Sequence, residues 1–218
     1  MIKAAAYDCE SLRNPTLYYE VYNMISPQRQ AYVDKATSLK VKCERLGASH
    51  ILEKLLWENH IQRPYEYGFT EQGKPILVSH EGIYFSLTHS KGVAAAVISD
   101  HPCGIDIEKI TVYKTAVAKR FFTRNDVEFL EGWEDADKPR KFMEVWTFKE
   151  ALAKMMDRPL TQILPWIDFH HYSDGCHGKY RWTKLGYTYQ DFFITICYEG
   201  PIEKIKMQIY DPYDGKYY

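Results

Sequence analysis

One order of predicted elements occurs twice along this chain and limits the folds open to it. The apolar run IKAAAYD at 2–8 predicts a strand, helical spacing follows, and two strand-like runs end near residue 99. Strand, helix and strands then follow again from residue 103, without a residue-level repeat. We therefore expect an α+β fold: two similar α/β halves of about 100 residues, 1–100 and 101–218, packed as a pseudo-dimer, each a small antiparallel sheet with a long helix.

In the first half, the helical stretch is predicted to begin at Ser26 and Pro27, a serine cap with a proline at the first helical position. Its helical spacing continues to about His60. The apolar positions that form its core stripe are Ile51, Leu52, Leu55 and Leu56. The sequence GKP at 73–75 predicts a turn, and the runs IYFSL at 83–87 and VAAAVIS at 93–99 predict strands.

The second half is predicted to open with the strand CGIDIEKI at 103–110. One helix is expected after Thr123, a cap with Asp126 three residues on, and a second from about Pro139 to Asp157. Four further strands are predicted from the runs WIDFHHY at 166–172, KYRWTKL at 179–185, YQDFFITICY at 189–198 and EKIKMQIY at 203–210.

Charge and cysteine content exclude several classes of protein. Lysine and arginine number 28 against 29 acidic residues, so the net charge of -1 gives no overall field for a nucleic acid or an anionic membrane. The five cysteines stand far apart without CxxC spacing, and no apolar run is long enough to span a membrane. The opening residues MIKAAAYDCE do not resemble a signal peptide. We expect a cytoplasmic protein with reduced thiols.

Two carboxylates share one face of the strand GIDIEK. Side chains alternate along a strand, so Asp106 and Glu108 point to the face opposite Ile105 and Ile107. Neighbouring like charges repel unless both coordinate a hard cation such as Mg²⁺, which prefers oxygen ligands. The alternative is an amphipathic strand with a solvated acidic face.

The helix KFMEVWTFKEALAKMMD at 141–157 contains a lysine inside its apolar stripe. Lys149 must therefore reach outward or meet a carboxylate, because burying an unpaired ammonium is costly. Glu150 and Lys154 stand one turn apart on the flank of the stripe, at the spacing of an ordinary helical ion pair. Either they form that surface pair, or the helix presents them for chemistry.

The segment FSLTHSKG at 85–92 places possible phosphate donors at a turn. Thr88, His89 and Ser90 offer hydroxyls and an imidazole there, although such hydroxyls also cap their own backbone. Positive charge would be added if the fold brought basic side chains of the first helical stretch nearby. Those side chains are Arg29, Lys40, Lys42 and Arg45, with Lys74 in its turn.

These segments, in this order, resemble the motifs of the 4'-phosphopantetheinyl transferases of the Sfp type. The corresponding motifs are a GKP turn at 73–75, an SHS-like segment at 88–90, a GxDxE strand at 104–108 and a WxxKEAxxK helix at 146–154. The resemblance covers about 26–184. The two similar halves of that family agree with the repeated element order.

The resemblance implies a site for coenzyme A and Mg²⁺. By this resemblance, Asp106, Glu108 and Glu150 hold Mg²⁺ against the pyrophosphate of coenzyme A, and Lys154 reaches the same pyrophosphate. The resemblance assigns the remaining coenzyme A contacts to Arg29, Arg45, Gly73, Lys74, Thr88 and His89. Thr88 stands where many members of the family have serine, which keeps the hydroxyl.

The activity implied is Mg-dependent transfer of 4'-phosphopantetheine from coenzyme A to a serine of an apo acyl or peptidyl carrier protein, with release of 3',5'-ADP. Glu150 is the candidate base and Lys154 the second catalytic residue, with Asp106 or a water as the alternative base. The family implies a monomer whose carrier surface follows the KEA helix. Candidate residues for that surface, each of which could equally belong to ordinary surface or to the core, are Met155, Met156, Arg158, Leu160, Lys179, Arg181 and Lys184.

Two other functions use the same residues. A Mg-dependent phosphodiesterase or nuclease would use the carboxylates to activate water, although the near-neutral charge disfavours long nucleic acids. A non-catalytic coenzyme A binder would keep the cleft without turnover. A zinc site is not expected from His170, His171, Cys176 and His177, because adjacent histidines on a strand face opposite ways.

Overall fold

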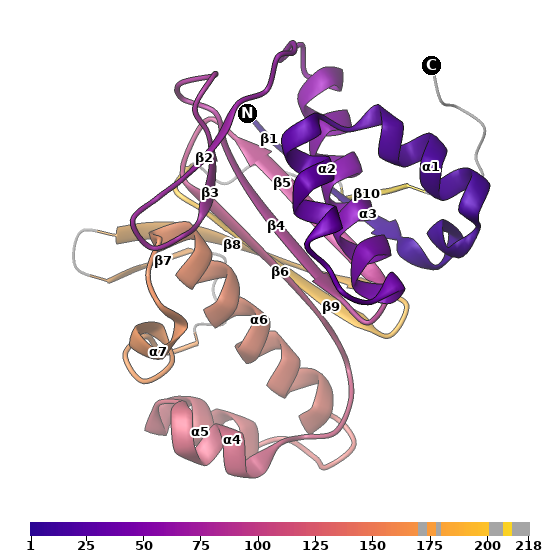
Figure 1. Cartoon of the computed structure of the whole chain (residues 1–218). Helices are drawn as coiled ribbons and strands as arrows, with labels where there is room; N and C mark the ends of the chain where they lie inside the picture. The colour runs from indigo at the N-terminus through magenta and orange to yellow at the C-terminus, as the bar shows by residue number, and fades with distance from the viewer. Residues whose placement is uncertain (170–173, 178–179, 201–206, 211–218) are drawn as a thin grey trace.

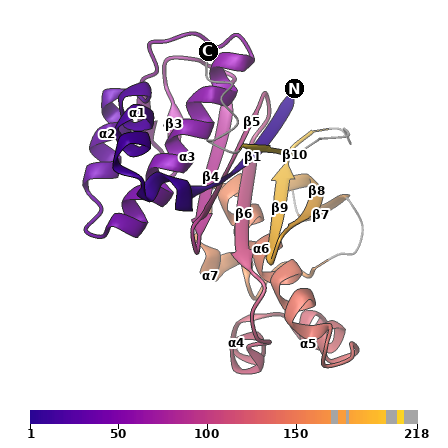
Figure 2. The same cartoon turned by 90° about the vertical axis from the view of Figure 1, so that its right-hand side faces the viewer.

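Two four-stranded sheets form the centre of the computed structural model, which describes residues 1–169, 174–177, 180–200 and 207–210. The first sheet has the strand order β10-β1-β5-β4 and the second β6-β9-β8-β7. Helices α1 to α3 lie on one side of the molecule and α4 to α7 on the other (Figure 1). The side view shows β4 and β6 running next to each other where the halves meet (Figure 2).

The first half contains the elements β1 (Ile2–Asp8), the 3-10 helix η1 (Cys9–Arg13), α1 (Pro15–Met24), α2 (Pro27–Asp34), α3 (Leu39–Glu58), β2 (Tyr67–Phe69), β3 (Pro75–Leu77), β4 (Tyr84–Ser90) and β5 (Val93–Ser99). The second half contains β6 (Cys103–Lys109), α4 (Thr115–Phe121), α5 (Arg124–Glu131), α6 (Lys138–Met156), α7 (Leu160–Ile163), β7 (Asp174–His177), β8 (Tyr180–Tyr189), β9 (Phe192–Tyr198) and β10 (Met207–Tyr210).

The two halves repeat one sheet topology. In the first, β5 lies between β1 and β4, and in the second β9 lies between β6 and β8, with every one of these pairs antiparallel. The long helices α3 and α6 occupy the same place in each order. The predicted α+β class with two similar halves is confirmed. One strand departs from the scheme, because β10 pairs parallel with β1 and so joins the sheet of the first half.

The first sheet is buried on both faces, which explains its alanine-rich strands. Ala5 and Tyr7 of β1 pack in the core beneath α3, whereas Ala4 and Ala6 face the core formed with β6 and β9. Ile105 of β6 belongs to that second core. Small side chains let the two sheets approach, and α6 covers the other face of the second sheet. The central strands of the first sheet therefore carry apolar residues on both faces.

Several predicted elements change in the structure. The single helical stretch from Ser26 to His60 is divided, because α2 ends at Asp34 and α3 begins after Ser38, whose side chain accepts from Val41 N at 3.3 Å. The Ser26 hydroxyl does not cap α2, since it donates to buried Glu53 at 2.5 Å.

Two further segments were predicted differently. Helix α1 was missed, although Asn14 caps it and a proline follows at its first position. The strand predicted at 166–172 is wrong over 166–169, which are non-helical and unpaired with any sheet, and 170–172 lie outside the described residues. The capping box of Thr123 and Asp126 is present as predicted.

Candidate functional site

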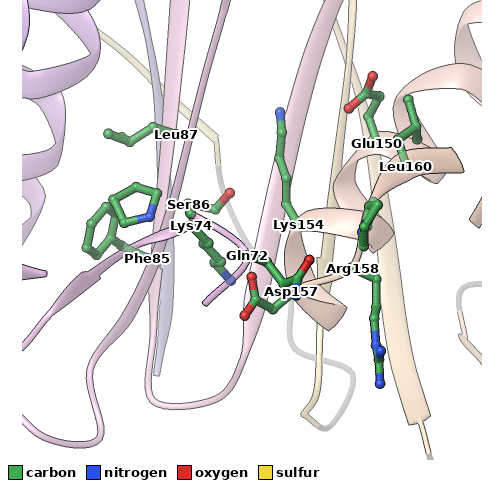
Figure 3. A pocket seen from close by; sticks show the side chains of 14 residues that line it. Gln72, Lys74, Phe85, Ser86, Leu87, Glu150, Lys154, Asp157, Arg158 and Leu160 are labelled. Carbon is green, nitrogen blue, oxygen red and sulfur yellow. The ribbon is translucent and has the colours of Figure 1, made fainter. Parts of the chain in front are cut away.

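A cleft of about 370 Å³ opens between the two halves, and the GKP turn and the KEA helix contribute to its walls. The first half supplies the turn at 72–75 and the start of β4, and the second half supplies the end of α6 and the residues after it. Figure 3 shows Lys74 and Ser86 on one wall and Glu150 and Lys154 on the other. Its volume lies within the range of small-molecule sites.

The GKP turn is held in place by glycine and by Thr70. Gly73 has φ +83°, a left-handed conformation that favours glycine, and its N–H donates to Thr70 O at 3.0 Å. The Thr70 hydroxyl donates to Asp157 Oδ1 at 3.0 Å, across to the end of α6. Lys74 Nζ donates to Cys103 O at 3.0 Å, and burial lowers the pKa of this ammonium, with Lys154 adding to the effect. The turn therefore bridges both halves.

Asp106 lies at the junction of β4, β6 and α6. Its Oδ1 accepts from Thr88 Oγ1 at 2.9 Å and from Lys154 Nζ at 2.7 Å. Its Oδ2 is buried and has no hydrogen-bond partner among the described residues. A buried carboxylate oxygen without a donor is costly, so this atom is available for a ligand that supplies positive charge.

Glu108 follows on the same face of β6, as the alternation of the strand predicted. Its Oε2 accepts from Ser90 Oγ at 2.8 Å. Burial raises the pKa of Glu108, and Asp106 adds to the rise, whereas the Ser90 hydrogen bond opposes it. The hydroxyls of Thr88 and Ser90 thus contact one carboxylate each. The sequence indicated Ser90 as a possible phosphate donor, whereas in the structure its hydroxyl donates to a carboxylate.

Glu150 stands on α6 without the ion pair that its spacing allows. Within the part of the chain that the structure describes, no salt bridge joins Glu150 to Lys154, because Lys154 turns to Asp106 of β6. Burial raises the pKa of Glu150 to about 7, and the negative charges of Asp106 and Glu108 contribute. The ordinary helical pair is therefore not formed, and three carboxylates influence one another electrostatically.

Close contact between α6 and β6 brings these groups together. A Cβ on Gly104 would lie 1.9 Å from Ala151 O and 2.6 Å from Met155 N, so only glycine admits the helix backbone at this distance. Lys154 Nζ also donates to Ile105 O at 3.0 Å. The glycine of the GxDxE segment thus sets the separation of α6 from the strand that carries the acidic pair.

A row of basic side chains continues from the cleft into the first half. His89 Nδ1 lies 3.0 Å from Glu44 Oε2 of α3. Burial lowers the pKa of His89, and the positive charges of Arg45 and Lys154 contribute while Glu44 opposes them. The positive charges of Lys154 and Arg45 therefore both act on His89.

Arg29 and Arg45 stack on the same tyrosine. The guanidinium carbon of each lies 4.6 Å from the centre of the Tyr32 ring. Arg29 is 5% exposed, its Nε donates to Ser49 Oγ at 3.0 Å, and its Nη2 has no hydrogen-bond partner among the described residues. Burial lowers the pKa of Arg29, and Arg45 adds to the effect. An anion would relieve both the orphaned donor and the repulsion.

Lys149 meets a carboxylate, one of the two outcomes expected for it. Its Nζ lies 2.6 Å from Asp126 Oδ2, and both side chains are fully buried. Lys149 also donates to Leu164 O at 2.9 Å and to Ile167 O at 2.5 Å. Asp126 accepts from Phe169 N as well, so this pair belongs to the structure of the second half rather than to the cleft.

The cation site expected from the motifs is not a compact cluster in this conformation. Among the described residues, no three His, Cys, Asp or Glu side chains are grouped so that they would hold a metal ion as they stand. Asp106 and Glu108 each use one oxygen for a β4 hydroxyl. The orphaned Asp106 Oδ2 and the unpaired, mutually repelling Glu150 are nevertheless the oxygen donors that a hard divalent cation takes.

The residues predicted as a carrier surface differ in their exposure to solvent. Met155 and Met156 are buried in the core beneath α6, so the prediction that they form an exposed patch is wrong. Lys184 lies over the Phe169 ring at 4.0 Å, and burial lowers its pKa to about 8. Arg158 and Arg181 are exposed and Leu160 is half-buried. Lys179, like His170 and His171, lies outside the described residues.

None of the helices in the described ranges has the length and the hydropathy needed to cross a lipid bilayer.

Comparison with known proteins shows what most of the second half is similar to. Residues 102–196 match the model of the 4'-phosphopantetheinyl transferase superfamily. The 4'-phosphopantetheinyl transferase gsp of Aneurinibacillus migulanus is 35% identical over 115 residues, which are 51% of this chain and 45% of the relative. The corresponding enzyme Sfp of Bacillus subtilis (strain 168) is 26% identical over 132 residues, 57% of this chain and 59% of Sfp.

A third relative extends the comparison beyond bacilli. The 4'-phosphopantetheinyl transferase HetI of Nostoc sp. is 34% identical over 95 residues, which are 41% of this chain and 40% of HetI. The chain spans about half the length of the curated relatives it matches. The matched residues include the GIDIE strand and the KEA helix. The resemblance to Sfp-type 4'-phosphopantetheinyl transferases predicted from the motifs is confirmed.

Proposed function

We propose that this chain transfers the 4'-phosphopantetheine group of coenzyme A to a serine of an apo carrier protein in a Mg-dependent reaction. The observation that carries the proposal is the cleft between the halves, where Lys74 and Ser86 face Glu150 and Lys154. Breaking a pyrophosphate bond requires carboxylates that bind a cation and ammonium groups that bind the phosphate oxygens. The serine oxygen forms a bond to the β-phosphorus, and the bond from that phosphorus to the bridging oxygen breaks to release 3',5'-ADP.

The residues suited to hold Mg²⁺ are Asp106, Glu108 and Glu150. Two observations support this assignment: the buried Asp106 Oδ2 has no hydrogen-bond donor, and the pKa of Glu150 is raised. A divalent cation would supply the missing partner of Asp106 Oδ2 and would lower the pKa of Glu150. When bound, Mg²⁺ would supply electrostatic stabilisation of charge on the pyrophosphate oxygens. The remaining steps depend on side chains of the chain itself.

Lys154 is suited to stabilise the same oxygens. An ammonium has three N–H donors, and two are used by Ile105 O and Asp106 Oδ1. The third has no partner among the residues that the structure describes, and the side chain is 29% exposed at the cleft. The contacts to β6 fix the position of the charge before substrate arrives, which is the condition for effective electrostatic catalysis.

Glu150 is suited to accept the proton of the carrier serine. A general base must lie within hydrogen-bond reach of the proton that it accepts, directly or through one water. The carboxylate of Glu150 lines the cleft and has no ion pair with the lysine one turn away. The proton of the attacking hydroxyl would pass to Glu150 as the new phosphorus–oxygen bond forms.

The basic row is suited to the phosphates and nucleotide of coenzyme A. His89 is influenced by the charges of Lys154 and Arg45, and Arg29 presents a buried guanidinium with one donor nitrogen unused by the described residues. Lys74 and the backbone of Gly73 stand at the other wall of the cleft. Thr88 donates its single hydroxyl proton to Asp106, so Thr88 serves a phosphate only if that hydrogen bond is exchanged.

Intact-protein mass spectrometry of an apo acyl or peptidyl carrier protein tests this proposal. After incubation with the chain, coenzyme A and Mg²⁺, the carrier should gain the mass of one phosphopantetheine and 3',5'-ADP should appear in equal amount. Glu150→Gln should slow transfer by about 10²–10⁴-fold, the usual contribution of a general base. Cleavage of coenzyme A without transfer would indicate a hydrolase, and coenzyme A binding without either product would indicate a binder. Either result would overturn the transferase.

A further inference from the structure

The edge of β4 that faces β6 carries a hydroxyl at every second position. Ser86, Thr88 and Ser90 share one face of the strand because side chains alternate. Backbone ladders do not join β4 to β6, which belong to different sheets. The seam between the two halves is therefore bridged here by side chains.

Each hydroxyl of this edge has a different acceptor or donor on β6. Ser86 Oγ accepts from Ile105 N at 3.2 Å, a contact with the backbone alone. Thr88 donates to Asp106 Oδ1 at 2.9 Å and Ser90 to Glu108 Oε2 at 2.8 Å. Advancing two residues along both strands thus leads from one carboxylate contact to the next, as in two strands that run in the same direction.

Ser90 is fixed by the turn that follows it. Gly92, in the left-handed conformation at φ +93°, donates its N–H to Glu44 Oε1 at 2.8 Å, and its carbonyl accepts from Cys9 N at 2.8 Å. Ser90 itself pairs with Val93 across the β4–β5 ladder. A hydroxyl held this firmly can orient the carboxylate that it contacts.

Glu108 needs such support more than Asp106 does. Asp106 is contacted by the Lys154 ammonium at 2.7 Å as well as by Thr88. Among the described residues, no basic nitrogen lies within 4.0 Å of the Glu108 carboxylate oxygens. Ser90 is its single hydrogen-bond donor among the described residues. We propose that Ser90 is a positioning residue that holds Glu108 in the orientation in which its other oxygen binds the divalent cation, an inference that rests on the proposed function.

Binding of Mn²⁺ in the presence of coenzyme A, followed by the electron paramagnetic resonance signal of free Mn²⁺, tests this role without turnover. Ser90→Ala should weaken Mn²⁺ binding about tenfold, the lower end of the effect usual for groups that support metal ligands. Ser90→Thr keeps the hydroxyl and should restore most of the affinity. In transfer assays, Ser90→Ala should raise the Mg²⁺ concentration needed for half-maximal rate by a similar factor.

Ser99→Ala is the matched control, because it removes a hydroxyl of the neighbouring strand β5 that lies outside the cleft and accepts from His101 N at 3.1 Å rather than contacting a carboxylate. Its Mn²⁺ affinity should stay within about twofold of the parent, since no supporting contact to a carboxylate is lost.

Equal Mn²⁺ affinity for Ser90→Ala and the parent would overturn the positioning role and leave the proposed function intact. Absence of Mn²⁺ binding by the parent would instead overturn the metal assignment in the proposed function. If Ser90→Ala loses cooperative unfolding, Ser90→Cys, a weak donor of similar volume, is judged by the same tenfold criterion.

Discussion

Two lysines of helix α6, Lys149 and Lys154, each pair with an aspartate of another element, and the two pairs differ in what surrounds them. Lys149 and Asp126 are 2.6 Å apart and fully buried, and backbone groups complete their hydrogen bonding. Lys154 and Asp106 are 2.7 Å apart, but Lys154 is 29% exposed at a cleft and one oxygen of Asp106 has no partner among the described residues. The first pair is complete, and the second leaves charge available to a ligand.

This difference shows how a charge pair that serves stability is recognised beside one that serves chemistry. Distance does not separate them, since the two differ by 0.1 Å. The two pairs differ in whether their remaining lone pairs and protons have hydrogen-bond partners. Buried charge is tolerated when every group is matched, and a group left unmatched at a cleft indicates a binding role.

The largest expected effect comes from neutralising the complete pair. Asp126→Asn leaves the Lys149 ammonium buried without a counter-charge, so the free energy of unfolding should fall by about 3–5 kcal/mol. Urea denaturation followed by far-UV circular dichroism measures the change. A loss below about 1 kcal/mol would mean that the pair is solvated and that the comparison fails.

A smaller loss is expected where α6 meets β6. Gly104→Ala forces a Cβ to within 1.9 Å of Ala151 O, so the helix must shift, and overpacking of this kind costs about 1–3 kcal/mol. Gly132→Ala is the matched control in the same half, since its added Cβ finds only contacts of 3.5 Å. Thermal unfolding of the two variants should differ clearly. Equal midpoints would show that the approach of α6 is not fixed at this glycine.

Neutralising the aspartate of the incomplete pair should change stability little and activity greatly. Asp106→Asn keeps a side-chain acceptor for Lys154 and Thr88 and removes repulsion with Glu108 and Glu150, so the free energy of unfolding should stay within about 1 kcal/mol. Transfer to a carrier protein should fall about 100-fold or more, because charge stabilisation is lost. Near-parental transfer would contradict the assignment of Asp106 to the cation.

A pH dependence of stability is also expected, and it originates in Glu150. Its pKa in the folded chain is raised to about 7 from the ordinary value of 4.5, so between these values the folded state binds more protons than the unfolded state. Stability should therefore decline as pH rises through this window. Glu150→Gln should flatten the decline and raise the melting temperature at pH 8. An unchanged slope would place the pKa of Glu150 near its ordinary value.

The fold was predictable where local pattern decides structure. Strand β1 has the predicted bounds, and alternation placed Asp106 and Glu108 on one face. The missed helix α1 had a readable signal in Asn14 followed by Pro15, and the break before α3 had one in Ser38. These caps are local features, so closer attention to them would have recovered both boundaries.

The pairing within the site was not predictable in the same way. The sequence indicated that Lys149 needs a carboxylate or an outward path, but Asp126 lies on another helix and only the packed fold selects it. The turn of Lys154 toward Asp106 and the contact of Ser90 with Glu108 also cross between elements. Single-sequence patterns describe faces of elements, and these contacts depend on how the faces meet.

Anomalous diffraction from crystals grown with coenzyme A and Mn²⁺ tests the central claim most directly. We expect a single strong Mn²⁺ peak in the cleft, within coordination distance of carboxylate oxygens of Asp106, Glu108 and Glu150 and beside the pyrophosphate of coenzyme A. A peak bound by other side chains, or coenzyme A bound in the cleft with these three carboxylates turned away from the metal, would contradict it.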